Sequence, residues 1–269
     1  MPYGIETVGL NYTATATTGA QPYTAQVGQS LNVRALGAGS NATIEALWTH
    51  SSAAGQTRIR SPRLHDDVVG TGGFHYLNNA SPILNEYYAQ TVYSQDTLIA
   101  EDYWVVAPGA VAQQAAFNVY YDDLPGVSAN IKSWAEVAPL IQSYFTVYVA
   151  PISAGAITSW GAGVAINSSQ DVFKANSWYA LIGYNTNVIF TAMSILGTDL
   201  GNLQYGGPGS VDPLITNRWF PFMENTSGKP SIPVINSQNK GATLVQVMDT
   251  TLTTTFYVGL IFAYLGPTG

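Results

Sequence analysis

The sequence alternates between apolar and polar positions in short runs, which is the pattern of half-buried β-strands. Segments rich in Gly, Pro, Asn and Ser separate these runs. In one of the clearest runs, Phe145, Val147 and Val149 fall on the same face. We therefore expect strands at residues 6–16, 31–36, 42–49, 87–93, 97–106, 115–121, 144–150, 178–184 and 188–196.

Two stretches far apart in the chain share one pattern. Residues 96–126 and 242–266 each open with an apolar run after Thr-Leu, pass a small-residue loop and continue into a longer aromatic strand. Leu98 matches Leu244 at an offset of 244 − 98 = 146. We interpret each stretch as a β-hairpin, so that the chain is one β domain written twice. The alternative is a chance similarity between Thr- and Ala-rich strands.

A second pair of stretches matches at nearly the same offset. Ser30 matches Ser177 at 177 − 30 = 147, and the order of matched segments is the same in both halves. We expect residues 31–49 to form a hairpin around the sequence GAGSN, whose glycines adopt positive φ at little cost. Residues 177–196 are expected to form the equivalent hairpin around Asn-Thr-Asn.

The middle of the chain carries its best helical pattern. In SANIKSWAEVAPLIQS, Ser133 and Glu136 have the spacing of a capping box, and Pro139 should end or kink the helix. We expect one short helix at most, in a linker at residues 126–143. This divides the chain into an N-terminal domain at residues 1–125 and a C-terminal domain at residues 144–269.

Many short strands with Gly- and Pro-rich turns favour a sandwich or barrel. About eight strands per half, joined by long connections, suit a jelly roll better than an up-and-down barrel. The predicted fold is therefore all-β, with two consecutive eight-stranded jelly rolls and one short linker helix.

In this architecture the chain resembles the double-jelly-roll major capsid proteins of tailless icosahedral viruses, including adenovirus hexon and membrane-containing bacteriophages. The resemblance implies a viral structural protein located in the virion that forms homotrimers and tiles a shell lattice. Its implied partners are further copies, other capsid or vertex proteins, and in some viruses an internal membrane.

The composition agrees with a protein that works through its surfaces. Only 9% of the 269 residues are charged, and 46% are hydrophobic. Uncharged polar side chains can be buried between subunits at modest cost once they are hydrogen-bonded. The net charge of −7 argues against sequence-specific nucleic-acid binding. Zero cysteines exclude disulfides and thiolate metal sites, and neither a secretory signal nor a membrane-spanning apolar run is apparent.

A few acidic and histidine residues are candidate metal ligands. His65 and Asp66 lie in a polar loop and could coordinate zinc or a hard divalent ion, while Asp122 and Asp123 could hold calcium at a subunit interface. The alternatives are local capping by His65 and an ordinary turn at Asp122-Asp123. Glu101-Asp102 is likewise interpreted as an ordinary turn. We predict no metal or other cofactor.

The basic residues cluster at Arg58, Arg60 and Arg63, and Arg58 and Arg60 share one face of a strand while Ile59 points the other way. They could contact phospholipid headgroups or a packaged genome. The alternative is pairing with carboxylates or a solvated strand face. No Ser/His/Asp arrangement with catalytic spacing is present, so we infer no enzyme.

Two other functions remain open at this point. One is a carbohydrate- or receptor-binding β protein, such as a spike or lectin, and the other is an extracellular filament subunit. Three of the six tryptophans, Trp48, Trp104 and Trp178, lie within strand patterns and are interpreted as core or interface anchors rather than sugar platforms.

Overall fold

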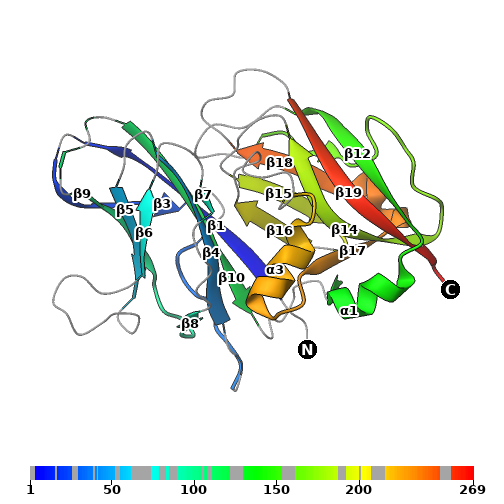
Figure 1. Cartoon of the computed structure of the whole chain (residues 1–269), viewed down its shortest axis with the longest axis horizontal. Coiled ribbons are helices and arrows are strands. Elements are labelled where there is room, and N and C mark those ends of the chain that lie inside the picture. The colour runs from blue at the N-terminus through cyan, green and yellow to red at the C-terminus, as the bar shows by residue number, and fades with distance from the viewer. Residues whose placement is uncertain are drawn as a thin grey trace.

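The computed structural model describes most of the chain, as strands with few helices (Figure 1). The described residues are 4–15, 17–25, 30–38, 40, 42–51, 55–61, 74–78, 83–84, 90–104, 106–107, 109, 111–121, 130–152, 161–186, 192–199, 201–206, 216–248 and 256–269. Their strands form four antiparallel sheets, which confirms the prediction of an all-β protein. Among these residues, no helix is both long and apolar enough to cross a membrane.

Two sheets make up the N-terminal half. One has the order β3-β1-β10-β4-β7, with β8 also pairing with β4, and the other has the order β2-β9-β5-β6. β7 and β8 pair with opposite ends of β4. The strands are β1 (Gly4–Ala14), β2 (Gly19–Pro22), β3 (Thr24–Ala25), β4 (Ala42–Ser51), β5 (Gly55–Arg60), β6 (Phe74–Asn78), β7 (Ile83–Leu84), β8 (Gln90–Val92), β9 (Ile99–Trp104) and β10 (Val111–Tyr121).

Two further sheets make up the C-terminal half. A five-stranded sheet has the order β11-β17-β14-β19-β12, and a four-stranded sheet has the order β13-β18-β15-β16. The strands are β11 (Ile131–Lys132), β12 (Ser143–Ile152), β13 (Val164–Ala165), β14 (Ser177–Thr186), β15 (Ala192–Gly197), β16 (Gly201–Gly206), β17 (Ile232–Asn236), β18 (Leu244–Met248) and β19 (Phe256–Pro267). The helical elements are α1 (Trp134–Val137), η1 (Ala138–Leu140), α3 (Trp219–Ser227) and η2 (Ser237–Ala242).

The two halves have the same strand order. Numbered along the chain, with the short β3, β7 and β11 left out, the strands of each half run 1-8-3-6 in one sheet and 2-7-4-5 in the other. In both halves, side chains from the two sheets form one core: one cluster includes Leu10, Ile59 and Phe117, and the other includes Val147, Val245 and Phe262. The internal repeat expected from the sequence is therefore matched by the order of the strands.

The segments expected to be closing hairpins are crossings between sheets. β18 belongs to the four-stranded sheet and β19 to the five-stranded sheet, and β9 and β10 are divided in the same way. Val245 on β18 and Leu260 on β19 are both fully buried in one core, which the two strands reach from opposite sides. The hairpin prediction was wrong, although the two crossings are equivalent in the two halves.

The other two expected hairpins are also absent. Residues 31–36 form no strand, and Asn32 makes an isolated β-bridge with Thr97. The expected partner of these residues, β4, pairs with β10. β14 and β15 lie in different sheets. By strand order the counterpart of β4 is β14, which gives an offset of 177 − 42 = 135 instead of the 147 obtained from sequence matching.

The predicted capping box is present at the start of α1. The Ser133 hydroxyl accepts a hydrogen bond from the Glu136 backbone N–H at 3.2 Å, and the Glu136 carboxylate accepts one from the Ser133 backbone N–H at 2.9 Å. At Pro139 the chain continues as the single 3₁₀ turn η1, because proline cannot donate the next helical hydrogen bond. Within the expected linker, β11 pairs with β17 of the C-terminal half. The domain boundaries themselves stay a prediction.

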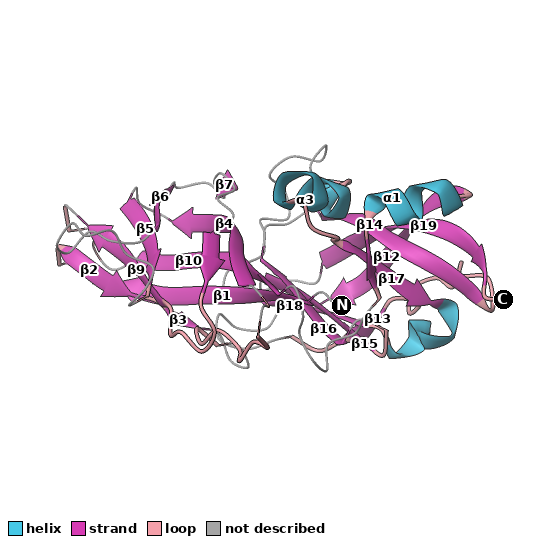
Figure 2. Cartoon of the chain, turned by 90° about the horizontal axis from the view of Figure 1, so that it is seen from below, coloured by secondary structure: helices cyan, strands magenta, loops and turns pink. Residues whose placement is uncertain are grey.

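The helix α3 corrects the expectation of a single short helix. Trp219, Phe220 and Met223 are buried at helical spacing, and Pro221 falls in the first turn, where its missing N–H costs no hydrogen bond. Gly228 ends the helix with φ of 69°, a left-handed conformation that glycine adopts readily. Figure 2 shows α3 and α1 over the outer face of the five-stranded sheet, opposite the four-stranded sheet.

Candidate interaction surface

The outer face of the C-terminal five-stranded sheet carries exposed aromatic side chains at one edge. Across the sheet, Val234, Ala180, Ala263 and Tyr144 are aligned in register and therefore share this face. Alternation along β12 places Thr146 and Tyr148 there as well, while Phe145, Val147 and Val149 point inward, as the sequence predicts. Tyr144 and Tyr148 are 57% and 51% exposed.

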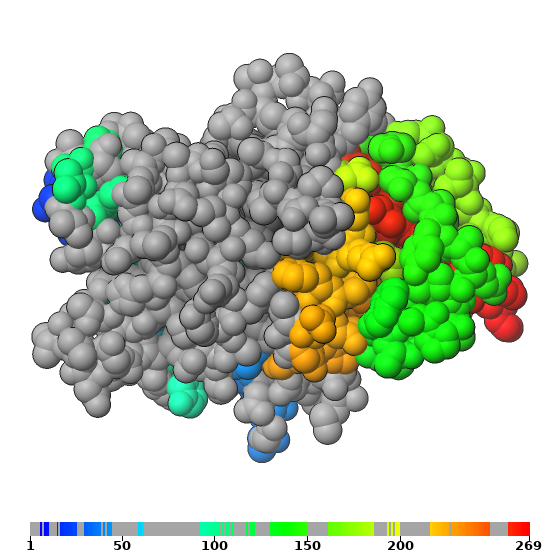
Figure 3. Space-filling model, viewed as in Figure 1, coloured from blue at the N-terminus to red at the C-terminus, as the bar shows by residue number. Residues whose placement is uncertain are grey.

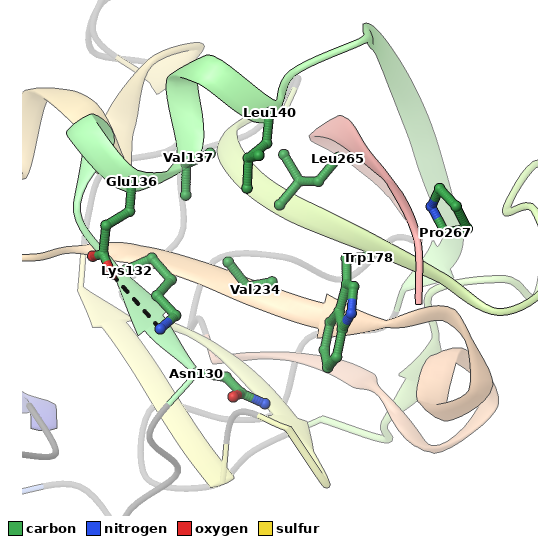
Figure 4. A pocket seen from close by; sticks show the side chains of 9 residues that line it. All are labelled: Asn130, Lys132, Glu136, Val137, Leu140, Trp178, Val234, Leu265 and Pro267. Carbon is green, nitrogen blue, oxygen red and sulfur yellow. Dashed lines mark ion pairs between the residues drawn. The ribbon is translucent and has the colours of Figure 1, made fainter. Parts of the chain in front are cut away.

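A groove of about 470 Å³ lies on the C-terminal half, between α1–η1 and the sheet (Figure 4). Six of its lining side chains are apolar, and three are polar. The apolar ones are Val137, Leu140, Trp178, Val234, Leu265 and Pro267, and the polar ones are Asn130, Lys132 and Glu136. Leu140 is 54% exposed, so the wall that η1 forms is open to solvent. This volume lies within the range of sites that hold small molecules or protein side chains.

The two charges in the groove neutralise each other. Lys132 Nζ lies 3.7 Å from Glu136 Oε1, and Figure 4 shows this pair at one end of the groove. The Ser133 backbone N–H donates to the Glu136 carboxylate, and this bond, with smaller contributions from the Ser133 hydroxyl and Lys132, lowers the pKa of Glu136. Glu136 is therefore ionised at neutral pH and paired, and the groove carries no net charge.

A second glutamate, Glu224, joins α3 to α1. Both carboxylate oxygens of Glu224 accept hydrogen bonds from the Trp134 backbone N–H, at 2.8 and 2.7 Å. Burial raises the pKa of Glu224 above its ordinary value, and the bonds from the backbones of Trp134 and Ser231 oppose this rise. Glu224 thus holds the start of α1 against the end of α3.

The opposite pKa shifts of these two glutamates predict opposite pH dependence in stability. Because the folded-state pKa of Glu224 is raised, its contribution to stability is present below the unfolded pKa and is lost as pH rises through the folded pKa. Glu136 has a lowered pKa, so its contribution is present above the unfolded pKa and is lost as pH falls. As the pH rises from about 4 to 7, the unfolding free energy of the wild type should fall relative to that of Glu224→Gln. Over the same range it should rise relative to that of Glu136→Gln. Urea unfolding at a series of pH values measures both differences; slopes of equal sign would contradict the assignment.

None of the four candidate metal ligands lies in the part of the chain that the structure describes. His65, Asp66, Asp122 and Asp123 lie outside the described residues. In the part of the chain that the structure describes, no group of three or more His, Cys, Asp or Glu side chains could hold a metal ion. The metal prediction is thus neither supported nor tested at these four positions.

The basic cluster is described only in part. Arg63 lies outside the described residues, and Arg58 is placed on β5 opposite Glu101 without a described side chain. The Nε of Arg60 is 2.8 Å from Oε1 of Glu101, so Arg60 pairs with a carboxylate of its own chain. Ile59 is fully buried, as expected from its place opposite the arginines. Contact of the three arginines with a membrane or genome stays a prediction.

The turn expected at Glu101-Asp102 was wrong. Both residues lie within β9, and their exposed fractions are only 5% and 0%. The Tyr23 hydroxyl donates a hydrogen bond to Oδ2 of Asp102 at 3.0 Å, and Arg60 pairs with Glu101. These two carboxylates can be buried in the N-terminal half because the Tyr23 hydroxyl and the Arg60 guanidinium bond to them there.

The groove was not predicted from the sequence because its walls come from distant segments. Asn130 to Leu140 provide one wall, and Trp178, Val234, Leu265 and Pro267 come from three different strands. Figure 3 shows the green segment of α1 and β12 beside the gold segment of α3 on one face of the molecule. The available signal was Trp178, which was interpreted as a core or interface anchor.

Comparison with known proteins gives only distant likenesses. No protein-family model matches the sequence, and no curated protein matches it. Among solved structures, the chain is similar to the PBSX exported protein XepA, with 12% identity, a TM-score of 0.25, and coverage of 97% of this chain and 86% of the other. It is similar to a chain of Sulfolobus Turreted Icosahedral Virus, with 10% identity and a TM-score of 0.25, covering 96% of this chain and 60% of that one. It is also similar to a T=1 Penaeus vannamei nodavirus structure, with 11% identity, a TM-score of 0.23 and full coverage of both chains. The likeness to these viral structures is weak, and at such TM-scores it carries no argument about the fold or function of this chain.

Proposed function

We propose that the chain is a structural virion protein, a major capsid subunit built from two consecutive jelly rolls. The observation that carries this proposal is the strand order, 1-8-3-6 facing 2-7-4-5, which occurs in both halves. A jelly roll is a sandwich of two four-stranded sheets with this order, and it recurs in viral capsids and lectins. Two such units in one chain give a subunit whose inward-facing side chains fill two cores and leave its outer surfaces for association.

The surface chemistry supports assembly rather than catalysis. With 9% charged residues, the chain has few ions to desolvate when copies pack together. The outer face of the C-terminal sheet carries two exposed tyrosines, a residue type enriched at protein interfaces. The proposed assembly is a homotrimer that tiles an icosahedral shell, in contact with other capsid or vertex proteins and, for the arginine cluster, with an internal membrane or genome. In this proposal the chain is not an enzyme.

The proposal predicts that the purified chain assembles. Size-exclusion chromatography with light scattering should give a trimer, and negative-stain imaging should show compact trimers or closed shells as protein concentration rises. A monomer at all concentrations and salt conditions would overturn the proposal. A monomer or small oligomer that binds glycans would favour the carbohydrate- or receptor-binding alternative, and fibres would favour the filament alternative.

A further inference from the structure

Tyr144 and Tyr148 lie on the outer face of β12, and both are exposed. Tyr148 is paired with Gly259 of β19, and Thr146 stands between the two rings along the strand. The two tyrosines are four residues apart, so their Cα atoms lie about 13 Å from each other. About half of each residue is exposed, so each tyrosine forms a knob with an apolar body and a polar tip.

The groove on the same half is a matching socket. Its apolar walls can receive an aromatic ring, and its volume of about 470 Å³ exceeds what one side chain needs. Asn130 and the Lys132–Glu136 pair lie among its walls, where polar atoms can meet a tyrosine hydroxyl. Figure 4 shows Leu140 and Leu265 pointing toward each other across the groove, with Val234 and Trp178 beneath them.

The charge of the molecule argues for a second copy as the occupant. At a net charge of −7, two copies repel each other, and they approach at least cost through surfaces that carry no net charge. The socket meets this condition because Lys132 pairs with Glu136. The knob meets it because β12 contains no charged residue. Charged partners, in contrast, find no uncompensated charge in the socket to bind.

The placement of knob and socket allows a reciprocal contact. The row that joins Val234 in the groove floor to Tyr144 on β12 shows that both lie on the same face of one sheet. Under two-fold symmetry, the knob of each copy meets the socket of the other. We propose that a second copy of this chain covers this face, with Tyr144 and Tyr148 of each copy against the groove formed by Leu140, Trp178 and Leu265 of the other. This inference rests on the proposed function: the two-fold contact would join subunits of neighbouring trimers in the shell, not subunits within one trimer.

A charge-pair experiment tests this contact. Leu140→Lys places a cation at the socket and Tyr148→Glu places an anion on the knob, and each variant alone should associate at least roughly tenfold more weakly than the wild type. Mixing the two variants should restore association, because the cation of one copy then meets the anion of the other. Val172→Glu is the control, since Val172 is 48% exposed in the same half but lies outside both the groove and β12. Sedimentation velocity measures association, and circular dichroism checks that each variant folds.

The outcomes separate this inference from the proposed function. Association that survives both single substitutions, or that falls equally with Val172→Glu, overturns the knob-and-socket contact while leaving shell assembly intact. A mixture that stays as weak as its components also overturns it. Wild-type dimers that use this contact but never form trimers or shells would support the contact and overturn the capsid proposal.

Discussion

Replacing Gly183 with alanine should destabilise the C-terminal half by about 3 kcal/mol, the upper part of the range for overpacked sites. Gly183 lies on β14 at a register shift between Leu181 and Gly183, where the chain entering α3 crosses the sheet. A Cβ atom built at this glycine would approach the Thr216 carbonyl oxygen and would lie 2.5 Å from the carbonyl carbon and oxygen of Asn217. These are backbone atoms, so relief requires the segment before α3 to move away from the sheet.

The measurement is a pair of urea and thermal unfolding curves. For a chain of this size, a loss of about 3 kcal/mol should lower Tm by roughly 6–12 °C. Gly241→Ala is the matched control, because no atom lies within 4 Å of its Cβ position and its φ is not positive. The control should change stability by no more than about 0.5 kcal/mol. Equal losses of stability in the two variants would show that the backbone of residues 216–217 does not lie this close to Gly183.

The sequence pattern predicts which face of a strand is buried but not which sheet the strand joins. Val147 and Val149 are buried as the alternation along β12 requires, and the Ser133–Glu136 capping box forms at the expected place. The closing strands, however, were interpreted as hairpins. A hairpin and a crossing between two facing sheets bury the same alternating positions, because both strands line one core in either case.

Sequence matching placed one pair of equivalent strands correctly and missed another. The offset of 146 at Leu98 and Leu244 agrees with the placement of β9 and β18 as seventh strands of their halves. The match of residues 31–49 with 177–196 failed because loops of different length precede the third strand in the two halves. Loops tolerate such insertions at small entropic cost, so offsets within a repeat drift from one strand to the next.

The groove illustrates why a surface site escapes sequence reasoning. Val137, Trp178 and Pro267 are each unremarkable in their own segments, and only the packing of α1–η1 on the sheet brings them together. The helix α3 was missed for a related reason, since Pro221 and the nearby Asn and Gly residues suggest a loop. The helix is stabilised by the packing of Trp219 and Met223 against the sheet. Local helix propensity does not include such tertiary contacts.

Replacing Tyr120 with alanine should separate the unfolding of the two halves. Phe117, Val119 and Tyr121 of β10 point into the N-terminal core, so Tyr120 points out of that sandwich. Its side chain is nevertheless fully buried, because it belongs to the core cluster of the C-terminal half. Among the described residues, Tyr120 is therefore a side chain through which the first half enters the core of the second.

Polar contacts surround this junction. Ser231 donates its hydroxyl proton to the carbonyl of Lys229 at 2.9 Å, so the Tyr120 hydroxyl is the donor in its bond to Ser231. Lys229 Nζ donates to the Thr43 hydroxyl at 2.8 Å and lies 5.9 Å from the centre of the Tyr120 ring. Thr43 on β4 is paired with Tyr120 on β10, so Lys229 spans two strands of the N-terminal half.

Tyr120→Ala removes the ring and leaves a cavity, at an expected cost of about 3–5 kcal/mol. Because this loss falls on the contact between the halves, calorimetry should resolve two transitions in place of the single one expected of the wild type. Tyr120→Phe is the matched control: it keeps the ring and removes one hydroxyl, while Ser231 keeps its bond to Lys229, so the cost should be about 1 kcal/mol with one transition retained. One transition for Tyr120→Ala, with a Tm as high as that of Tyr120→Phe, would mean that the halves are held together elsewhere, through the packing of β1 against β16.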